Sequence, residues 1–151
     1  MSSHDELKPV VLVADDEDPS RTALADTLLF FDYEVLEASC GQELFDKVDR
    51  LLNARKKLDV LIVDNQMPNQ PGETDSQWCG FERMRELCIK WNGDLGKRVL
   101  FVSRWGLIDL PDGHQDINVL VEPERWLPTG TPFFILASRI EGVLSKRGKV
   151  S

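Results

Sequence analysis

The chain has 151 residues and a formal net charge of −8, from 26 acidic and 18 basic side chains. This length fits one domain that buries a core without disulfide or metal support. The acidic balance argues against nucleic-acid binding, and no apolar run approaches the ~18 residues of a membrane span. The first residues lack the apolar stretch of a signal peptide, and three irregularly spaced cysteines suit a reducing compartment. We therefore expect a single cytoplasmic domain over residues 1–151, with its core at about 9–147.

The first half of the chain alternates short apolar runs with helical patterns. Val10–Ala14 is a continuous apolar run, which is typical of a strand buried on both faces. A helix is predicted over about 18–31, where an aspartate and a proline stand at its start. A weaker strand follows at Tyr33–Ala38, and apolar residues at helical spacing predict a second helix over about 39–57.

The middle of the chain repeats this alternation after one long loop. Leu58–Val63 is the third predicted strand, and residues 65–79 are polar and rich in proline and glycine, as in a loop. A helix is predicted over 81–91, and a fourth strand over Arg98–Val102.

The last part of the chain completes the predicted sheet. Glycine and proline interrupt residues 104–117, so we expect the fourth helix to be short or degenerate. Val119–Val121 is the predicted fifth strand, and the last helix begins near Thr131. Five strands alternating with helices predict an α/β fold with a doubly wound, five-stranded parallel sheet in the flavodoxin-like order 2-1-3-4-5.

Carboxylates follow two of the strands that are neighbours in this order. Asp15 and Asp16 end the first strand, and Asp64 ends the third. In an open parallel sheet the carboxyl ends of the strands form the binding crevice, so these three side chains should converge. Like charges at this spacing need a cation, and a set of oxygen donors suits Mg²⁺. Ser103, which ends the fourth strand, could donate a hydrogen bond to a phosphoryl oxygen.

Four motifs end or follow the predicted strands: Val-Leu-Val-Ala-Asp15-Asp16-Glu17, Leu-Ile-Val-Asp64-Asn-Gln-Met67-Pro68, Val-Leu-Phe-Val-Ser103 and Val-Leu-Val-Glu122-Pro123. Together they resemble the receiver domain of bacterial two-component response regulators, the CheY-like family, over nearly the whole chain. The resemblance implies that Asp64 accepts a phosphoryl group from a histidine kinase. It also implies that Asp15 and Asp16 hold Mg²⁺ with Asp64 and the main-chain carbonyl of Gln66, and that Ser103 is the switch hydroxyl.

The sequence departs from the family pattern near the expected phosphate site. The family places a lysine before the fifth-strand proline, where this chain has Glu122. Arg104 follows Ser103 in place of a small residue and is a candidate phosphate contact. The loop after Met67-Pro68 carries an insertion of roughly eight residues, relative to the family pattern.

Two functions remain open, with a third disfavoured. The first is a self-phosphorylating signalling switch, not a turnover enzyme, which takes its phosphoryl group from a histidine kinase or phosphotransfer protein and signals to an output protein. The second is a pseudo-receiver that binds partners without being switched by phosphorylation. An aspartyl phosphohydrolase is disfavoured because Gln66 stands where that class has a second acid. We expect no contact with nucleic acid or membrane, no output domain within these residues, and a homodimer as one available assembly.

Overall fold

A computed structural model describes residues 8–91, 93–106, 109–110 and 122–148. Its main sheet contains five parallel strands in the order β2-β1-β3-β6-β7. The strands are β1 (Val10–Ala14), β2 (Glu34–Ala38), β3 (Val60–Asp64), β6 (Val99–Ser103) and β7 (Trp126–Pro128). With the strands of this sheet numbered along the chain, the order is 2-1-3-4-5, so the predicted fold class is confirmed.

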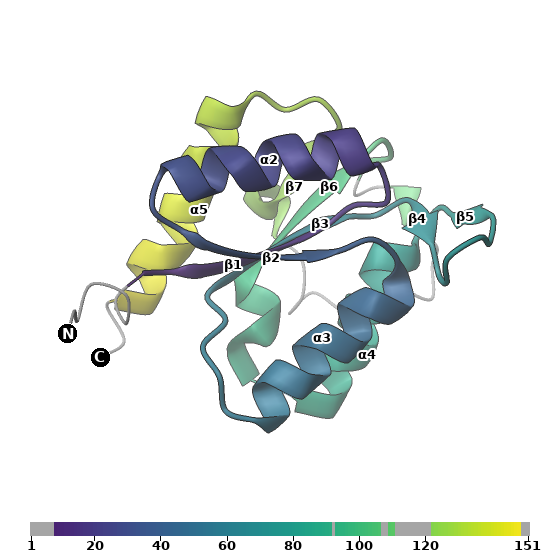
Figure 1. The fold of residues 1–151 in the computed structure, drawn as a ribbon, viewed down its shortest axis with the longest axis horizontal. Helices are drawn as coiled ribbons and strands as arrows, with labels where there is room; N and C mark the ends of the chain where they lie inside the picture. The colour runs from purple at the N-terminus through teal and green to yellow at the C-terminus, as the bar shows by residue number, and fades with distance from the viewer. Residues whose placement is uncertain (1–7, 92, 107–108, 111–121, 149–151) are drawn as a thin grey trace.

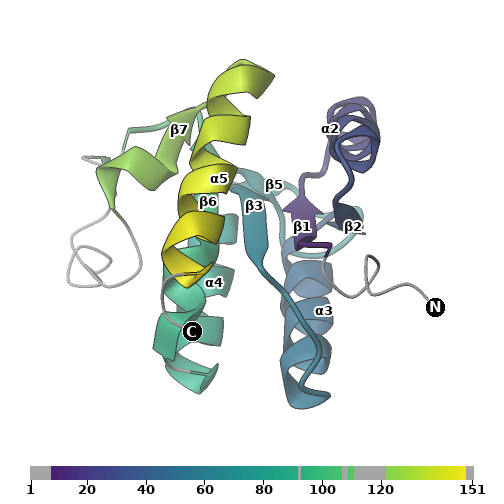
Figure 2. The same cartoon turned by 90° about the vertical axis from the view of Figure 1, so that its left-hand side faces the viewer.

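Helices cover both faces of the sheet. The helices are α2 (Asp18–Phe30), α3 (Gly41–Asn53), α4 (Cys79–Trp91) and α5 (Phe133–Gly148), with the short 3₁₀ helices η1 (Gly93–Arg98) and η4 (Pro123–Arg125). In Figure 1, α2 and α5 lie on one side of the sheet and α3 and α4 lie on the other, and Figure 2 shows the same two layers from the side. Among the described residues, no helix is long and apolar enough to cross a bilayer.

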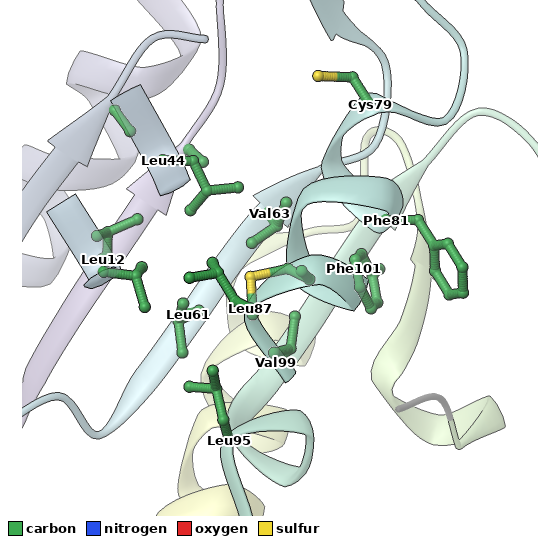
Figure 3. Packing of buried hydrophobic residues seen from close by; sticks show 14 of the residues in the cluster. Leu12, Leu44, Leu61, Val63, Cys79, Phe81, Leu87, Leu95, Val99 and Phe101 are labelled. Atoms are coloured by element: carbon green, nitrogen blue, oxygen red, sulfur yellow. The ribbon is translucent and has the colours of Figure 1, made fainter. Parts of the chain in front are cut away.

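The continuous apolar runs of the central strands follow from this two-sided covering. Alternate side chains of β1 and β3 point to opposite faces, and both sets are buried. On the α3–α4 side, strand residues such as Leu12 and Phe101 pack against Leu44 and Leu87 of the helices (Figure 3). This packing fixes where each strand ends, and therefore where the polar residues beyond it lie.

The fifth strand differs from the prediction. Val119–Val121 lies outside the described residues, and the described sheet instead ends in Trp126–Pro128. In the register of this pair, Phe101 lies opposite Trp126 and Ser103 opposite Pro128. A proline is tolerated here because β7 is an edge strand. Most of residues 104–117 lies outside the described residues, and so does most of the predicted fourth helix.

The predicted loop at 65–79 contains a short antiparallel ribbon, which we call the inserted hairpin (residues 67–76). It pairs β4 (Met67–Pro68) with β5 (Asp75–Ser76) and extends beyond the sheet in Figure 1. Its base is held by Asn69, whose backbone carbonyl accepts a hydrogen bond from Gln42 N at 2.7 Å. Asn69 Oδ1 accepts a second from Arg83 Nε at 2.7 Å. The insertion is thus attached to both α3 and α4.

Candidate functional site

Three carboxylates meet at the carboxyl edge of the sheet. Ala14, the last residue of β1, lies beside Val63 in β3, so the chain segments that follow both strands emerge together. Oxygen atoms of Asp15, Asp16 and Asp64 all lie within 4.8 Å of one another. The convergence expected from the strand order is therefore present. Since every donor is a carboxylate oxygen, the arrangement suits a hard divalent cation better than zinc or a redox metal.

Burial and mutual repulsion raise the pKa values of these three carboxyl groups. Burial, together with the charge of Asp15, raises the pKa of Asp64 to about 7. Burial also raises the pKa of Asp15. The pKa of Asp16 is raised by burial and then by the charge of Asp75, a residue of the inserted hairpin. A bound cation would lower the pKa of all three groups, because it would stabilise their charged forms.

Backbone hydrogen bonds fix the rotation of two of the carboxylates. Glu17 N donates to Asp15 Oδ1 at 3.0 Å, and Gln66 N donates to Asp64 Oδ1 at 3.1 Å. Both are local turns in which an aspartate accepts from the residue two positions later. Arg21 Nη1 donates to the main-chain oxygen of Asp15 at 2.8 Å. The orientation of the cluster is therefore built into the loops after β1 and β3.

The start of α4 is pressed against the end of β3. Gly80 N donates to the backbone oxygen of Asn65 at 3.0 Å, and Phe81 N donates to Asn65 Oδ1 at 2.9 Å. An added Cβ on Gly80 would lie 2.4 Å from the backbone oxygen of Asp64 and 2.7 Å from Val63 Cγ1. Only glycine allows this approach, so α4 directly supports the backbone of Asp64.

Ser103 lies at the same edge as the cluster. Its neighbour Val102 is the register partner of Asp64, which places Ser103 one residue further along β6. The side chain is buried, and its Oγ accepts a hydrogen bond from Trp105 N at 3.0 Å. Arg104, between these two residues, is exposed. Ser103 is therefore the last residue of β6, the strand beside β3, and Arg104 follows it directly.

The predicted position of Glu122 is wrong. Glu122 precedes η4 and β7, and its carboxylate lies 3.6 Å from Arg125 and 3.9 Å from Lys146. Arg125 Nη1 in turn donates to the backbone oxygen of Val99, the first residue of β6. Because β6 and β7 are parallel, this places Glu122 at the amino edge of the sheet, opposite the carboxylate cluster.

The residue before the proline that ends the fifth strand is Leu127. It is buried in the core between the sheet and the α2–α5 layer. The residue before the proline of the fifth strand is therefore neither a lysine nor a glutamate. A sequence signal existed, since Trp126-Leu127-Pro128 stands just before the Thr-Gly-Thr turn that begins α5, but Val119–Val121 is the more apolar run. No sequence signal indicates that the charge of Asp75 raises the pKa of Asp16, because Asp75 lies in the inserted hairpin.

The raised pKa of Asp64 predicts that the cation-free protein loses stability as the pH rises. The folded-state value of about 7 exceeds the ordinary 3.8, so the folded chain holds this proton more tightly than the unfolded chain does. The contribution is complete below about pH 4 and is lost as the pH rises through about 7. We expect a loss of about 1–2 kcal/mol, less than the full shift implies because the carboxyl is partly solvated.

Urea unfolding in EDTA at pH 5 and pH 8 measures this effect. Asp64→Asn should remove most of the difference between the two pH values and stabilise the protein at pH 8. Asp26→Asn, which removes the same charge from an exposed position of α2, should behave as the unmodified protein. An unchanged pH dependence in Asp64→Asn would show that the raised pKa of this carboxyl is not the cause of the stability change.

Neither a protein-family model nor a curated protein sequence matches the chain. Solved structures do match. A CheY-like response regulator receiver domain protein from Methanospirillum hungatei JF-1 is 16% identical with a TM-score of 0.70, covering 95% of this chain and 99% of that one. The receiver domain from the hybrid histidine kinase CckA is 28% identical with a TM-score of 0.58, covering 89% and 98%. The Vibrio cholerae chemotaxis protein CheY4 is 23% identical with a TM-score of 0.63, covering 90% and 98%.

The fold and the comparisons together define the fold class of this protein. The chain has the fold of CheY-like response regulator receiver domains, and the match spans most of its length. The resemblance inferred from the four sequence motifs is confirmed at the level of fold.

Proposed function

We propose that the chain is a receiver domain of two-component signal transduction, which accepts a phosphoryl group on Asp64. The observation that carries this proposal is the convergence of Asp15, Asp16 and Asp64 within 4.8 Å at the carboxyl edge of a receiver fold. The reaction is a self-catalysed transfer that switches the protein, so we class it as a signalling protein and not as a turnover enzyme. We assign this role to one domain over residues 1–151.

The residues present fit a Mg²⁺ ion. Three carboxylates supply oxygen donors and negative charge, and the main-chain carbonyl of Gln66, two residues after Asp64, is the fourth proposed donor. The pKa values of Asp15, Asp16 and Asp64 are all raised, because the carboxylates are partly buried and repel one another, and a bound cation would oppose this effect. When bound, Mg²⁺ would neutralise the carboxylates and shield the charge of the incoming phosphoryl group.

Asp64 acts as the nucleophile in this proposal. A carboxylate oxygen attacks the phosphorus of a phosphohistidine, the P–N bond breaks, and the imidazole leaves with the bonding electrons. Only the ionised carboxyl can attack, so a pKa of about 7 limits the reactive fraction near neutral pH unless a cation lowers it. The hydrogen bond from Gln66 N to Oδ1 holds the carboxylate in one rotation during the approach.

Ser103 and Arg104 complete the proposed phosphate contacts. The Ser103 hydroxyl accepts from Trp105 N, which leaves its own hydrogen to be donated to a phosphoryl oxygen. Because Leu127 brings no charge to the fifth strand, Arg104 is the cation that we propose faces the phosphoryl group. Its place directly after Ser103 supports this assignment.

Phosphorylation is tested by intact mass after incubation with acetyl phosphate and Mg²⁺. We expect the mass of one phosphoryl group to be added to the unmodified protein and to Asp26→Asn, and no addition to Asp64→Asn. The addition should reverse in hydroxylamine, which cleaves acyl phosphates. A chain that stays unmodified over prolonged incubation contradicts the proposal and favours the alternative below.

One observation favours a pseudo-receiver as the second candidate. The residue before the proline of β7 is the buried Leu127 and not a lysine, so the phosphorylated state would depend on the exposed Arg104 for its stabilising charge. In that case the protein is a binding module, and the inserted hairpin, held firmly against α3 and α4, is its proposed partner surface.

The partners that we propose follow from the first function. A histidine kinase or a phosphotransfer protein supplies the phosphoryl group, and an output protein reads the switch by direct contact, with a homodimer as a further available assembly. The net charge of −8 disfavours nucleic acid and an anionic membrane surface as partners. We place the protein in the cytoplasm, where such kinases present their phosphohistidine.

A further inference from the structure

A cluster of apolar side chains is exposed where the end of α2 meets the start of α5, two helices on the same side of the sheet (Figure 1). We call it the aromatic patch and define it as Leu29, Phe30, Phe31, Phe133 and Phe134. Phe30 and Phe134 are 83% and 74% exposed, and Leu29 and Phe31 are each 55% exposed. These four are most of the large apolar side chains that are exposed in the described part of the chain. Single exposed apolar residues are ordinary, but such clusters mark interaction sites.

The sequence places more apolar residues here than the fold can bury. Residues 28–31 read Leu-Leu-Phe-Phe, and successive residues of a helix point in directions about 100° apart. Leu28 is fully buried against the sheet, so the three residues after it cannot also face the core. In α5, Leu136 is buried in the same core and Phe134 is not. One apolar stripe is enough to pack each helix on the sheet, so folding alone leaves the second one unexplained.

The rings of the patch contact one another in two geometries. Phe31 of the α2 end stacks on Phe133 of α5, with ring centroids 5.5 Å apart and an angle of 21° between the planes. Phe30 meets Phe31 edge to face, at 5.3 Å and 87°. Ring faces are partly negative and ring edges partly positive, so aromatic pairs form offset stacks or edge-to-face contacts. A surface that presents both faces and edges is therefore complementary to a second copy of itself.

The area of the patch matches what a dimer needs. With about 200 Å² for a whole phenylalanine side chain, the exposed fractions correspond to roughly 500 Å² of apolar surface per copy. A standard interface buries about 800 Å² per partner, of which somewhat more than half is apolar. The patch therefore supplies the apolar core of such an interface. Charges of both signs stand at its margin, where Lys8 Nζ lies 3.8 Å from the exposed Asp32, so a polar rim is present as well.

We propose that the aromatic patch is the interface of a symmetric dimer, in which the same residues of two copies of this chain pack against each other. Each copy carries a net charge of −8, so two copies repel at long range and the apolar contact supplies the attraction. The proposal gives the homodimer a defined surface on α2 and α5. It does not rest on phosphoryl transfer, since it needs only the exposed rings.

Sedimentation equilibrium over about 5–500 µM protein tests the proposal. We expect a monomer–dimer equilibrium within this range. Phe30→Ser with Phe134→Ser should weaken dimerisation at least a hundredfold, because an interface aromatic contributes about tenfold or more and each change acts twice in a symmetric dimer. Both side chains are exposed in the single chain, so the double variant should keep its circular dichroism spectrum. Asp64→Asn should dimerise as the unmodified protein does, which separates this test from that of phosphorylation.

Ile89→Ser is the matched control. Ile89 is 73% exposed on α4, on the opposite side of the sheet, so this change removes apolar surface away from the patch and should leave dimerisation unchanged. Added sodium chloride should strengthen the dimer, because salt screens the repulsion between two acidic copies.

Four results would each overturn the proposal. They are a chain that stays monomeric at about 500 µM, a Phe30→Ser and Phe134→Ser variant that dimerises like the unmodified protein, an equal loss in Ile89→Ser, and a dimer that salt dissociates. A monomeric chain would leave the patch to a partner other than a second copy.

Discussion

Replacing Asp16 and Asp64 together by asparagine should lower the affinity for Mg²⁺ at least a hundredfold. These residues are two of the three carboxylates whose oxygens lie within 4.8 Å, and each substitution removes a charged donor. Loss of a residue that only supports a metal ligand already costs about ten- to a hundredfold in affinity. Loss of two direct donors therefore should leave no measurable binding at millimolar Mg²⁺. Isothermal titration calorimetry, or the fluorescence of the half-exposed Trp105 beside Ser103, measures it.

A matched double variant separates this effect from general loss of charge. Asp26→Asn with Asp94→Asn removes two acidic charges from exposed positions of α2 and η1 and should bind Mg²⁺ within a factor of two of the unmodified protein. Circular dichroism checks that both double variants remain folded. Equal Mg²⁺ affinity in the two double variants would place the ion away from the cluster.

Most of the sheet and the carboxylate cluster could be predicted because their signals are local and redundant. Val10–Ala14 and Leu58–Val63 are continuous apolar runs, since both strands are covered on both faces. Each run ends at an aspartate, and the order of the parallel sheet places these two strand ends side by side. A pattern of strand ends is therefore enough to place Asp15, Asp16 and Asp64.

The edge of the sheet could not be predicted in the same way. β7 is short, pairs on one side only and ends in a proline, so its sequence lacks the apolar run that marks a buried strand. Val119–Val121 has that run, so the sequence alone predicts Glu122 beside the proposed phosphate site. Tertiary contacts determine which segment forms the edge strand. Trp126 packs against Phe81 and Phe101, and this packing fixes which residues pair with β6.

The inserted hairpin shows a second limit of sequence reasoning. Its polar composition predicts a loop, but neighbours distant in sequence determine its position: Gln42 from α3 and Arg83 from α4 both bond Asn69. This attachment carries Asp75 to a place where its charge acts on Asp16. No spacing rule within one sequence links residues 75 and 16, so this part of the site emerges only from the fold.

Gly80→Ala should destabilise the protein by about 2–3 kcal/mol and weaken Mg²⁺ binding as well. The new Cβ would lie 2.4 Å from the backbone oxygen of Asp64 and 3.1 Å from Asn65 Cα, and backbone atoms cannot rotate away as a flexible side chain can. Overpacking of this kind costs about 1–3 kcal/mol, and a contact with backbone belongs at the upper end. The displacement falls on the peptide that carries the proposed phosphoacceptor, so stability and cation affinity should fall together.

The chain offers a glycine of the opposite kind as the control. Gly142, an exposed residue of α5, has nothing within 4 Å of an added Cβ, so Gly142→Ala should stabilise the protein by about 0.5–1 kcal/mol through helix propensity and leave Mg²⁺ affinity unchanged. Urea unfolding and calorimetric titration of both variants give the two quantities. If Gly80→Ala were as stable as the unmodified protein, α4 would be able to move away from β3. The position of Asp64 would then depend on the loop alone, because the contact at Gly80 is what joins the helix layer to the backbone of the site.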